Sequence, residues 1–377
     1  MRWHRLLAMA RKEFIQILRD TRSLAIVVTM PLILMLFYGY GVNLDYKNIP
    51  VCAFDREGSQ QSQDLLRRFE ASDYFTVVRV AANYAAVVEG VEAGECQLAV
   101  VIPHDFSQRL ATGQPAAVQA IVDATDDNGA NIVMGYSEAV VAGYSQELQM
   151  DWLGQQGRTG FQVPLNVEAR TWFNEELESK DFIIPGIVAL VMAVIGAFLT
   201  SLTIAREWER GTMEQLISTP VSRIEIMIGK LVPYFVIGLL DTALCAVIAV
   251  GWFGVPFRGQ WTTLLLSSAL FLLGVLGQGY FISVVTKSQL AASQAALVST
   301  LLPAFLLSGF LFAIEQMPAV IQTITHVIPA RYYVSILKGV FLKGTPPALL
   351  AEHLLALAVF AALVMGLATR AFHKRLV

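Results

Sequence analysis

The segment AREWERGTMEQLISTP (Ala205–Pro220) carries charges of both signs and lies between two long apolar stretches. The flanking stretches, Phe182–Ile204 and Ile226–Val250, are each long enough to cross bilayer hydrocarbon, which is about 30 Å thick. A short charged segment between two such stretches is typical of a loop that joins two membrane helices at the membrane surface. The segment therefore predicts a polytopic membrane protein and one of its surface loops.

Composition supports a membrane protein. The chain has 377 residues, of which 55% are hydrophobic and 15% are charged, so it is more apolar than ordinary soluble proteins. The first apolar stretch exceeds the roughly 7–15 residues of a signal-peptide core and no A-x-A-like site follows it, so we interpret it as a retained anchor. Windows of about 19 residues predict six spans: Leu24–Val42, Phe182–Ile204, Ile226–Val250, Thr262–Val285, Leu290–Ala313 and Leu349–Ala371.

The distribution of Lys and Arg predicts the orientation. With six spans, the basic loops and both termini fall on one side, which the positive-inside rule makes cytoplasmic. The loop after the fifth span fits less well, because it is also basic (Arg331, Lys338 and Lys343). The basic residues on the predicted cytoplasmic side are Arg2, Arg5, Arg11, Lys12, Arg19, Arg22, Arg206, Arg210, Arg223, Lys287, Arg370, Lys374 and Arg375.

This orientation places the long polar insert, residues 44–181, outside the cytoplasm. Strand-like runs at Val51–Phe54, Phe75–Val80, Gln97–Ile102 and Ala117–Asp123 alternate with helix-compatible segments, which predicts an α/β domain with a mixed or parallel sheet. Residues from Asn128 to Trp152 are predicted to form a long helix that returns the chain towards the membrane.

Two of the three cysteines, Cys52 and Cys96, fall in this insert near the starts of predicted strands. In an oxidising compartment they can form a disulfide. The alternative is that both are small buried hydrophobic residues. The third, Cys245, lies in the third span.

The charged loop itself contains a short predicted helix. Gly211 can end the preceding helix, Thr212 with Gln215 fits a capping box, and Ser222 with Glu225 fits a second one. The helix between these breaks, Met213–Ile217, exposes Met213, Leu216 and Ile217 beside Glu214 and is too short to be stable alone, so it needs a surface to dock on. The alternative is a solvated loop whose charges only mark the cytoplasmic side.

The residues of this loop resemble a known family. REWERGTMEQLISTPVSRIEIMIGKLVPY (Arg206–Tyr234) is similar to the signature of type-2 ATP-binding-cassette (ABC) exporter permeases, particularly bacterial multidrug-type members with a large periplasmic insert. The resemblance continues in Arg11–Gly41, in Leu301–Gly344 and in the order of spans. It implies that residues 212–219 form a coupling helix that docks on a separate ATP-binding subunit. The contact would involve Glu207, Glu209, Arg210, Thr212, Met213, Glu214, Leu216 and Ile217.

The resemblance also implies an amphipathic interface helix within residues 1–23, before the first span at 24–43. Its apolar residues Phe14, Ile15, Ile17 and Leu18 would face lipid, while Arg11, Lys12, Arg19 and Arg22 meet headgroups. Thr21 stands where family members commonly carry Pro. A second permease subunit is implied, in a homodimer or a related heterodimer, and a periplasmic adaptor with an outer-membrane channel is a possible further partner.

No cofactor site is predicted in this chain. The closest candidate for a phosphate-binding loop, MIGKL (Met227–Leu231), lacks the glycine spacing and the hydroxyl that such a loop needs, so ATP and Mg are expected on the partner subunit. The five His residues are scattered and no catalytic motif occurs, so we predict neither a catalytic nor a metal site, and no nucleic-acid partner.

Several polar residues fall in or near the predicted spans. Asp241, near the middle of the third span, either packs and hydrogen-bonds with hydroxyls such as Thr242, or lines a translocation path, or couples protons. Gln278, between Gly277 and Gly279, is expected to pack where two helices approach closely.

Residues 315–343, which follow the fifth span, are too apolar for a free loop and are interrupted by Pro318 and Pro329. We expect two short re-entrant helices there, a form of backbone that protein or water must satisfy. Glu315, His326 and Arg331 would then gate the outer mouth. The alternative is interfacial anchoring by Tyr332 and Tyr333, with Arg331 extending to the headgroups.

Together, these features predict a six-helix polytopic membrane protein with an inserted extracytoplasmic α/β domain, in the bacterial inner membrane. The resemblance implies the permease subunit of an ATP-driven exporter for amphiphilic small molecules, drugs or lipid-like substrates. Two alternatives are an ion-coupled secondary transporter that uses Asp241 and a mechanotransmission or signalling protein that transports nothing.

Overall fold

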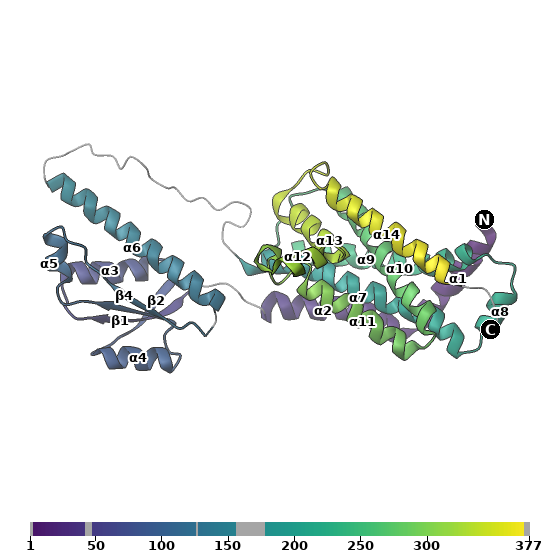
Figure 1. The fold of residues 1–377 in the computed structure, drawn as a ribbon, viewed down its shortest axis with the longest axis horizontal. Coiled ribbons are helices and arrows are strands. Elements are labelled where there is room, and N and C mark those ends of the chain that lie inside the picture. The colour runs from purple at the N-terminus through teal and green to yellow at the C-terminus, as the bar shows by residue number, and fades with distance from the viewer. Residues whose placement is uncertain (1–2, 42–46, 126, 156–177, 373–377) are drawn as a thin grey trace. The chain divides into compact units, whose positions relative to one another are not determined.

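The computed structural model describes residues 3–41, 47–125, 127–155 and 178–372, without the side chains of residues 22–23, 127–128, 151–155 and 217 (Figure 1). Lys374 and Arg375, like Arg2 and the predicted domain boundary at residue 44, therefore lie outside the described residues. The chain divides into a helical unit, Met1–Asn43 with Arg170–Val377, and an α/β unit, Leu44–Ala169. Each unit is described by itself below.

The α/β unit contains a four-stranded mixed sheet in the order β2-β1-β3-β4. The central strand β1 is parallel to both β2 and β3, and β3 is antiparallel to β4. The strands occupy or overlap the four runs predicted from the sequence. Their bounds are β1 Ile49–Asp55, β2 Phe75–Val80, β3 Leu98–Ile102 and β4 Gln119–Val122.

Four helices cover the two faces of this sheet: α3 Gln60–Ala71, α4 Tyr84–Glu92, α5 Phe106–Ala111 and α6 Asp127–Gln155. Successive side chains of a strand point to opposite faces. Accordingly, Val51 joins the core formed with α3, α5 and α6, whereas its neighbour Cys52 joins a smaller core with α4 on the other face. Figure 1 shows α4 on the side of the sheet opposite α3 and α6.

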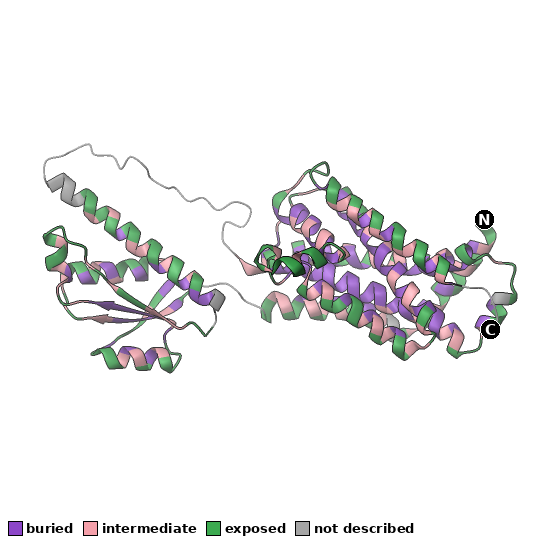
Figure 2. Cartoon of the chain, viewed as in Figure 1, coloured by how far each residue is buried: buried purple, intermediate pink, exposed green. Residues whose placement is uncertain are grey.

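Within its described residues, the helical unit has six helices that are long and apolar enough to cross a membrane. Helix α7 is its centre: it is almost entirely buried, and α2, α9, α10, α11 and α13 all pack against it (Figure 2). Few residues of α2, α11 and α14 are buried, as expected of helices that face lipid or another subunit. The bounds are α2 Thr21–Gly41, α7 Ser179–Glu209, α9 Arg223–Gly251, α10 Trp261–Thr286, α11 Gln289–Leu306 and α14 Ala351–Ala371.

Three predicted boundaries differ from the structure. The fifth span ends at Leu306 instead of Ala313, because Ser308 bonds to Ala304 O and Phe310 N, and Gly309 adopts φ +77°. The interface helix, predicted within residues 1–23, ends earlier: α1 spans Trp3–Arg19, and Asp20 alone separates it from α2, which begins at Thr21. The second membrane helix begins at Ser179, so the predicted domain end at residue 181 falls inside α7.

Residues 314–343 fold as two short helices with helical turns at either end, which agrees with the prediction of two short helices. The elements are η1 Ile314–Gln316, α12 Ala319–Thr325, α13 Pro329–Lys338 and the π-helix η2 Gly339–Lys343. Pro318 precedes α12 and Pro329 opens α13, where a missing N–H costs nothing. That these helices enter a membrane leaflet stays a prediction. In Figure 1, α12 lies at the end of the helical unit opposite α8.

Candidate functional site

The charged loop folds as a tightly capped short helix, α8, Met213–Ser218. Helix α7 ends in a Schellman motif: Gly211 N–H donates to Trp208 O (3.1 Å), Thr212 N–H donates to Glu207 O (3.0 Å), and Gly211 has φ +67°, which favours glycine. After α8, the predicted capping box of Ser222 and Glu225 is present and starts α9. Two well-defined ends therefore fix the direction of α8.

The first predicted capping box, Thr212 with Gln215, is wrong. Thr212 has helical backbone angles and makes no side-chain cap bond; its hydroxyl instead donates to the carboxylate of Glu207. The reason is the Schellman motif, which turns Thr212 back onto the last turn of α7. Thr212 therefore joins α8 to α7 by a side-chain contact as well as by the chain.

The prediction that Met213 and Leu216 are exposed is also wrong. They are only 1% and 8% exposed, and both pack into the core of the helical unit. An amphipathic helix buries its apolar residues against its own chain when a core is at hand. The exposed residues of α8 are Glu214, Gln215 and Ser218, while the side chain of Ile217 lies outside the described residues.

A buried ionic network lies next to this loop and joins α1, α7 and α9. Lys230 Nζ on α9 is 3.1 Å from Glu13 Oε2 on α1 and 3.2 Å from Glu207 Oε1 on α7, and these three side chains are at most 7% exposed. The half-exposed Lys12 adds a fourth charge, 2.9 Å from Glu207 Oε1, and Tyr234 donates to Glu13 Oε1 (3.4 Å). The network joins α1, α7 and α9 through three buried charges and the half-exposed Lys12.

Glu207 is the member that connects the network to α8, because its carboxylate also accepts the Thr212 hydroxyl bond. The two other predicted contact residues on α7 differ from it. Glu209 is exposed and accepts hydrogen bonds from the backbone and side-chain nitrogens of Gln289, the first residue of α11. Arg210 is exposed at the C-cap of α7.

Weaker contacts surround the network at the same end of the unit. Asp20 lies 3.5 Å from Arg206, and Lys287, at the end of α10, lies over the Trp208 ring at 4.6 Å from its centre. Arg5 donates to Pro220 O just after α8. In Figure 1, α1, α8 and the end of α14 lie together at this end of the helical unit. In the helical unit, α1, α7, α9, α10 and α11 are thus each connected to the α8 loop or its network by a polar or cation–π contact.

Sequence reasoning missed Glu13 and Lys230. The signal was available: each is a charged residue on an otherwise apolar helix face, which predicts an opposite charge on a neighbouring helix. The lipid-facing assignment of Ile17, one turn from Glu13, is wrong, since Ile17 is 5% exposed and packs in the core. Phe14, Ile15 and Leu18 are exposed, and the side chain of Arg22 lies outside the described residues.

Asp241 is buried on α9, where it lines a cavity of about 10 Å³ together with Met192, Tyr234 and Leu272. The expected bond with Thr242 is absent: Thr242 donates to Met192 Sδ and Gly238 O. The nearest polar contact of Asp241 is Cys245 Sγ, 3.9 Å from Oδ1. A cavity of this size holds about one water molecule. Asp241 thus shares this cavity with Tyr234, a member of the ionic network, but no hydrogen bond or ion pair joins the two among the described residues.

At the opposite end of the unit, the structure brings together two of the three predicted gate residues. Arg331 Nη1 lies 3.1 Å from His326 Nδ1, and it also donates to Thr325 Oγ1 and to Gln322 O. Glu315 lies apart in η1, where its backbone carbonyl accepts from Gln322.

The structure bears on two further predictions: close helix packing at Gln278, and the alternative that Tyr332 and Tyr333 anchor at the membrane interface. Tyr333 cannot anchor at the interface, because it is fully buried and stacks on Phe271 at 4.2 Å. Gln278 bonds to Ser299 on α11, and a Cβ added at Gly279 would clash with Ala197 O on α7, which agrees with close helix packing.

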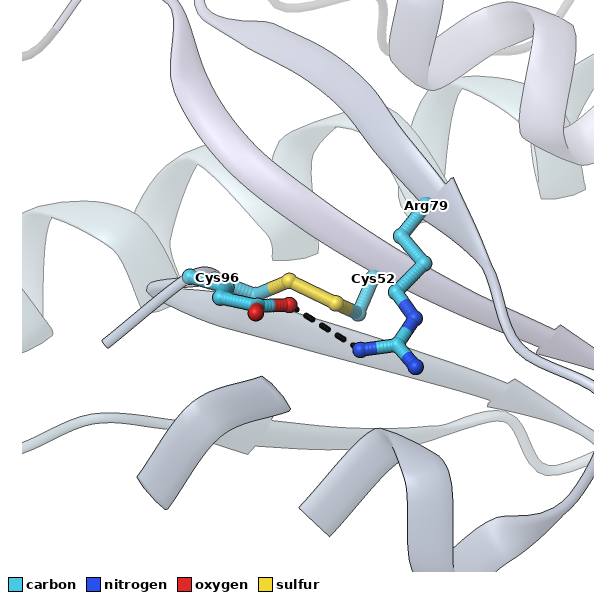
Figure 3. Close-up of a disulfide and its surroundings, with 4 residues drawn as sticks. Cys52, Arg79 and Cys96 are labelled. Carbon is cyan, nitrogen blue, oxygen red and sulfur yellow. Dashed lines mark hydrogen bonds and ion pairs between the residues drawn. A yellow bond between two sulfur atoms is a disulfide. The ribbon is translucent and has the colours of Figure 1, made fainter. Parts of the chain in front are cut away.

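In the α/β unit, Cys52 and Cys96 form a disulfide with their Cα atoms 5.7 Å apart (Figure 3). Cys52 lies on β1, and Cys96 precedes β3. Both are buried under α4, and the ion pair of Arg79 with Glu95 (2.9 Å) lies beside them. The alternative of two unbonded hydrophobic residues does not apply.

Comparison with known proteins identifies the family. Residues 22–370 match the family described as "ABC-2 family transporter protein". The chain belongs to this family. The ABC-2 chain is 41% identical over 375 residues to the probable multidrug ABC transporter permease YbhS of Escherichia coli K12, covering 99% of this chain and 98% of that protein. It is 30% identical to YbhR of the same strain, another probable multidrug ABC transporter permease, over 90% of each chain.

A more distant relative is also named as a permease. The inner membrane transport permease YhhJ of E. coli K12 is 26% identical over 298 residues, covering 78% of the ABC-2 chain and 77% of YhhJ. The family and these relatives make the chain a membrane permease subunit of an ABC exporter, and its apolar helices make it a multi-pass inner-membrane protein.

Proposed function

We propose that this permease receives its driving force from a separate ATP-binding subunit docked on the exposed face of α8. That subunit binds ATP and Mg, and this chain contributes the receiving surface: Glu214, Gln215 and Ser218 on α8, with Arg210 and Glu209 on the preceding turn. The buried residues Met213 and Leu216 fix α8 to the helical unit instead of contacting the partner.

The observation that carries this proposal is the position of Glu207. One carboxylate binds Thr212 at the start of α8, Lys230 on α9 and Lys12 on α1. Any displacement of α8 therefore acts on a charged group that cannot lose its partners cheaply, since breaking a buried ion pair costs about 3–5 kcal/mol. The network moves with α8 as a unit and passes the displacement to α1, α7 and α9.

The proposed orientation has the α8 end and both termini in the cytoplasm and the α/β unit in the periplasm. Two independent features support it: the basic residues at the α8 end follow the positive-inside rule, and the Cys52–Cys96 disulfide needs an oxidising compartment. In the periplasm, the α/β unit would guide substrate or bind an adaptor that leads to an outer-membrane channel.

The proposed cargo is amphiphilic small molecules, drugs or lipid-like compounds. YbhS and YbhR are named as multidrug permeases, and a mostly apolar helical unit suits amphiphilic substrates. A second permease subunit completes the transporter, as a homodimer or a heterodimer with a related chain. The exposed apolar surfaces of α2, α11 and α14 offer the area that such a partner needs.

Co-purification of the tagged permease from its native membrane tests the docking face. The variant Glu214→Arg with Ser218→Arg changes only exposed residues of α8, so the helical unit stays folded. Glu352→Arg, an exposed residue in the first turn of α14, is the matched control. We expect the ATPase to accompany wild type and the control, and to be lost or uncoupled from transport in the double variant.

Retention of a fully coupled ATPase by the double variant would contradict docking at α8. Purification of an active transporter without any ATPase would contradict ATP-driven export altogether and favour ion coupling. The variant Thr212→Val separates transmission from docking: it keeps the exposed face and removes the bond to Glu207, so ATPase binding should persist while substrate-stimulated ATP hydrolysis falls.

A further inference from the structure

The helical unit contains an apolar groove distinct from the α8 network. Its volume is about 250 Å³, and helices α10, α11 and α14 line it together with the α12–α13 turn. Both α11 and α14 pack against α10, which forms the floor with Phe271, Val275 and Phe281. Two of its lining residues, Val327 and Leu367, are 71% and 46% exposed, so the groove is open to the surroundings of the unit.

The size of the groove limits its occupant. Pockets for drug-sized ligands are typically about 300–1,000 Å³, so this groove is too small for a bulky drug but suits a slender alkyl chain. Its lining is almost wholly apolar, and the bond between Gln278 and Ser299 satisfies the polar groups that cross it. An acyl chain is the occupant that matches both properties.

Two basic residues flank one wall of the groove. The residues Val327, Ile328, Pro329 and Ala330 form one wall, and they are the whole segment between His326 and Arg331. The side chains of these two residues approach each other, with Arg331 Nη1 3.1 Å from His326 Nδ1. Arg331 has no carboxylate within ion-pair distance among the residues that the structure describes.

The hydrogen bonds of the pair leave donors for an anion. Among the described residues, Arg331 uses Nη1 for all of its side-chain hydrogen bonds, which lie at the C-terminal turn of α12. His326 is exposed, and its Nδ1 lies 3.0 Å from Gln322 O and 3.1 Å from Arg331 Nη1. In the tautomer in which Nδ1 accepts from Arg331, Nε2 carries the proton; in the other tautomer, Nδ1–H donates to Gln322 O and Nε2 is an acceptor. The Arg331 guanidinium therefore supplies the charge that binds a phosphate, and His326 adds an N–H donor in the first tautomer.

We propose that this groove is a binding site for an anionic phospholipid, with one acyl chain between α11 and α14 and the phosphate at Arg331 and His326. Neither part suffices alone: the chain contributes apolar burial and the phosphate contributes charge pairing. The site lies on a single chain and does not involve the α8 network, so it does not depend on ATPase docking.

Native mass spectrometry of the purified permease tests the proposal with phosphatidylglycerol and phosphatidylcholine that carry identical chains. We expect tighter binding of phosphatidylglycerol, and a loss of about tenfold in Arg331→Gln that leaves phosphatidylcholine binding unchanged. Val364→Trp, which fills the groove from α14, should weaken both lipids. Lys343→Gln, an exposed cation outside the groove, is the control and should bind like wild type.

Arg331→Gln also removes bonds to α12, so His326→Gln, an exposed position, gives a second test of the headgroup site. Equal binding of the two lipids by wild type would overturn the proposal. So would equal binding of glycerol phosphate, which has the anion without a chain.

Photo-crosslinking from position 367 identifies the occupant directly. A lipid adduct supports the site, whereas a product of twice the mass of the chain would assign the groove to a second permease subunit and overturn the proposal.

Discussion

Lys230 on α9 and Glu13 on α1 are 217 residues apart in the sequence and form an ion pair of 3.1 Å that is almost fully excluded from solvent. A buried pair of this kind is retained at a high desolvation cost, which Glu207 and Lys12 offset by extending it into a network. Because the network lies beside the α8 loop, the cost of breaking its ion pairs resists any movement of α8 that is independent of α1, α7 and α9.

Lys230→Met should strongly destabilise the permease. The substitution leaves Glu13 and Glu207 buried without their shared cation, which costs about 3–5 kcal/mol. Lys12→Met is the matched control: its side chain is half exposed, so its loss should cost less than about 1 kcal/mol. Thermal unfolding of both variants in detergent compares them, and equal melting temperatures would show that the buried network contributes no stability.

Gly279→Ala should disrupt the contact between α7 and α10. A Cβ at this position would clash with Thr200 Oγ1 and with Ala197 O, and the backbone atom cannot rotate away. Overpacking of this kind costs about 1–3 kcal/mol or more. Gly366→Ala, on α14, is the control, because its added Cβ would have no atom of another described side chain or helix within 4 Å. The measurement is the yield and melting temperature of each variant; a fully stable Gly279→Ala would contradict this packing.

Cys52→Ser should destabilise the α/β unit and reveal its compartment. The disulfide closes a loop with a sequence separation of 44 residues, which corresponds to a contribution of about 4 kcal/mol in the chain-entropy estimate. In cells, Cys96 should react with a thiol-specific mass tag only in Cys52→Ser or after reduction. Cys245→Ser, which removes the buried free thiol, is the control. Tagging of Cys52 and Cys96 in the untreated wild type would place the unit in a reducing compartment.

The α/β unit should lose stability in acid, partly through Glu57. The hydroxyl and the backbone N–H of Ser107 donate to this carboxylate, as does Ser59, and they hold its pKa below the usual 4.5. A lowered pKa in the fold means that the stabilisation is fully present above pH 4.5 and is lost as the pH falls through the folded value.

Ser107→Ala should therefore reduce the stability of the unit at neutral pH and flatten its dependence on pH below 4.5. Hydrogen exchange of β1 and α5 in the full-length chain measures this change. The exposed carboxylate Glu92 provides the control variant, Glu92→Gln. An unchanged slope in Ser107→Ala would show that Glu57 does not contribute to the acid sensitivity.

The elements that follow from local patterns could be predicted, and those that depend on distant pairs could not. A short continuous stretch of sequence is enough to specify each of three features: the six apolar helices, the four strands, and the capping box of Ser222 with Glu225. The partner of Lys230 is not, because nothing in the sequence near α9 specifies which helix brings Glu13 beside it. Thr212 shows the same limit at short range, since two local motifs compete for it and the cap of α7 prevails.

The junction of α1 and α2 has a mechanical consequence. Backbone hydrogen bonds bridge Asp20, from its N–H to Gln16 O (3.1 Å) and from Leu24 N–H to Asp20 O (3.0 Å), so the junction lacks a free hinge. The 21 residues of α2 form a lever arm about 30 Å long. A tilt of roughly 5° at its base would swing the far end by about 3 Å. Under the proposed coupling, a push on α1 would therefore be delivered as a displacement at the far end of α2, before any substrate is touched.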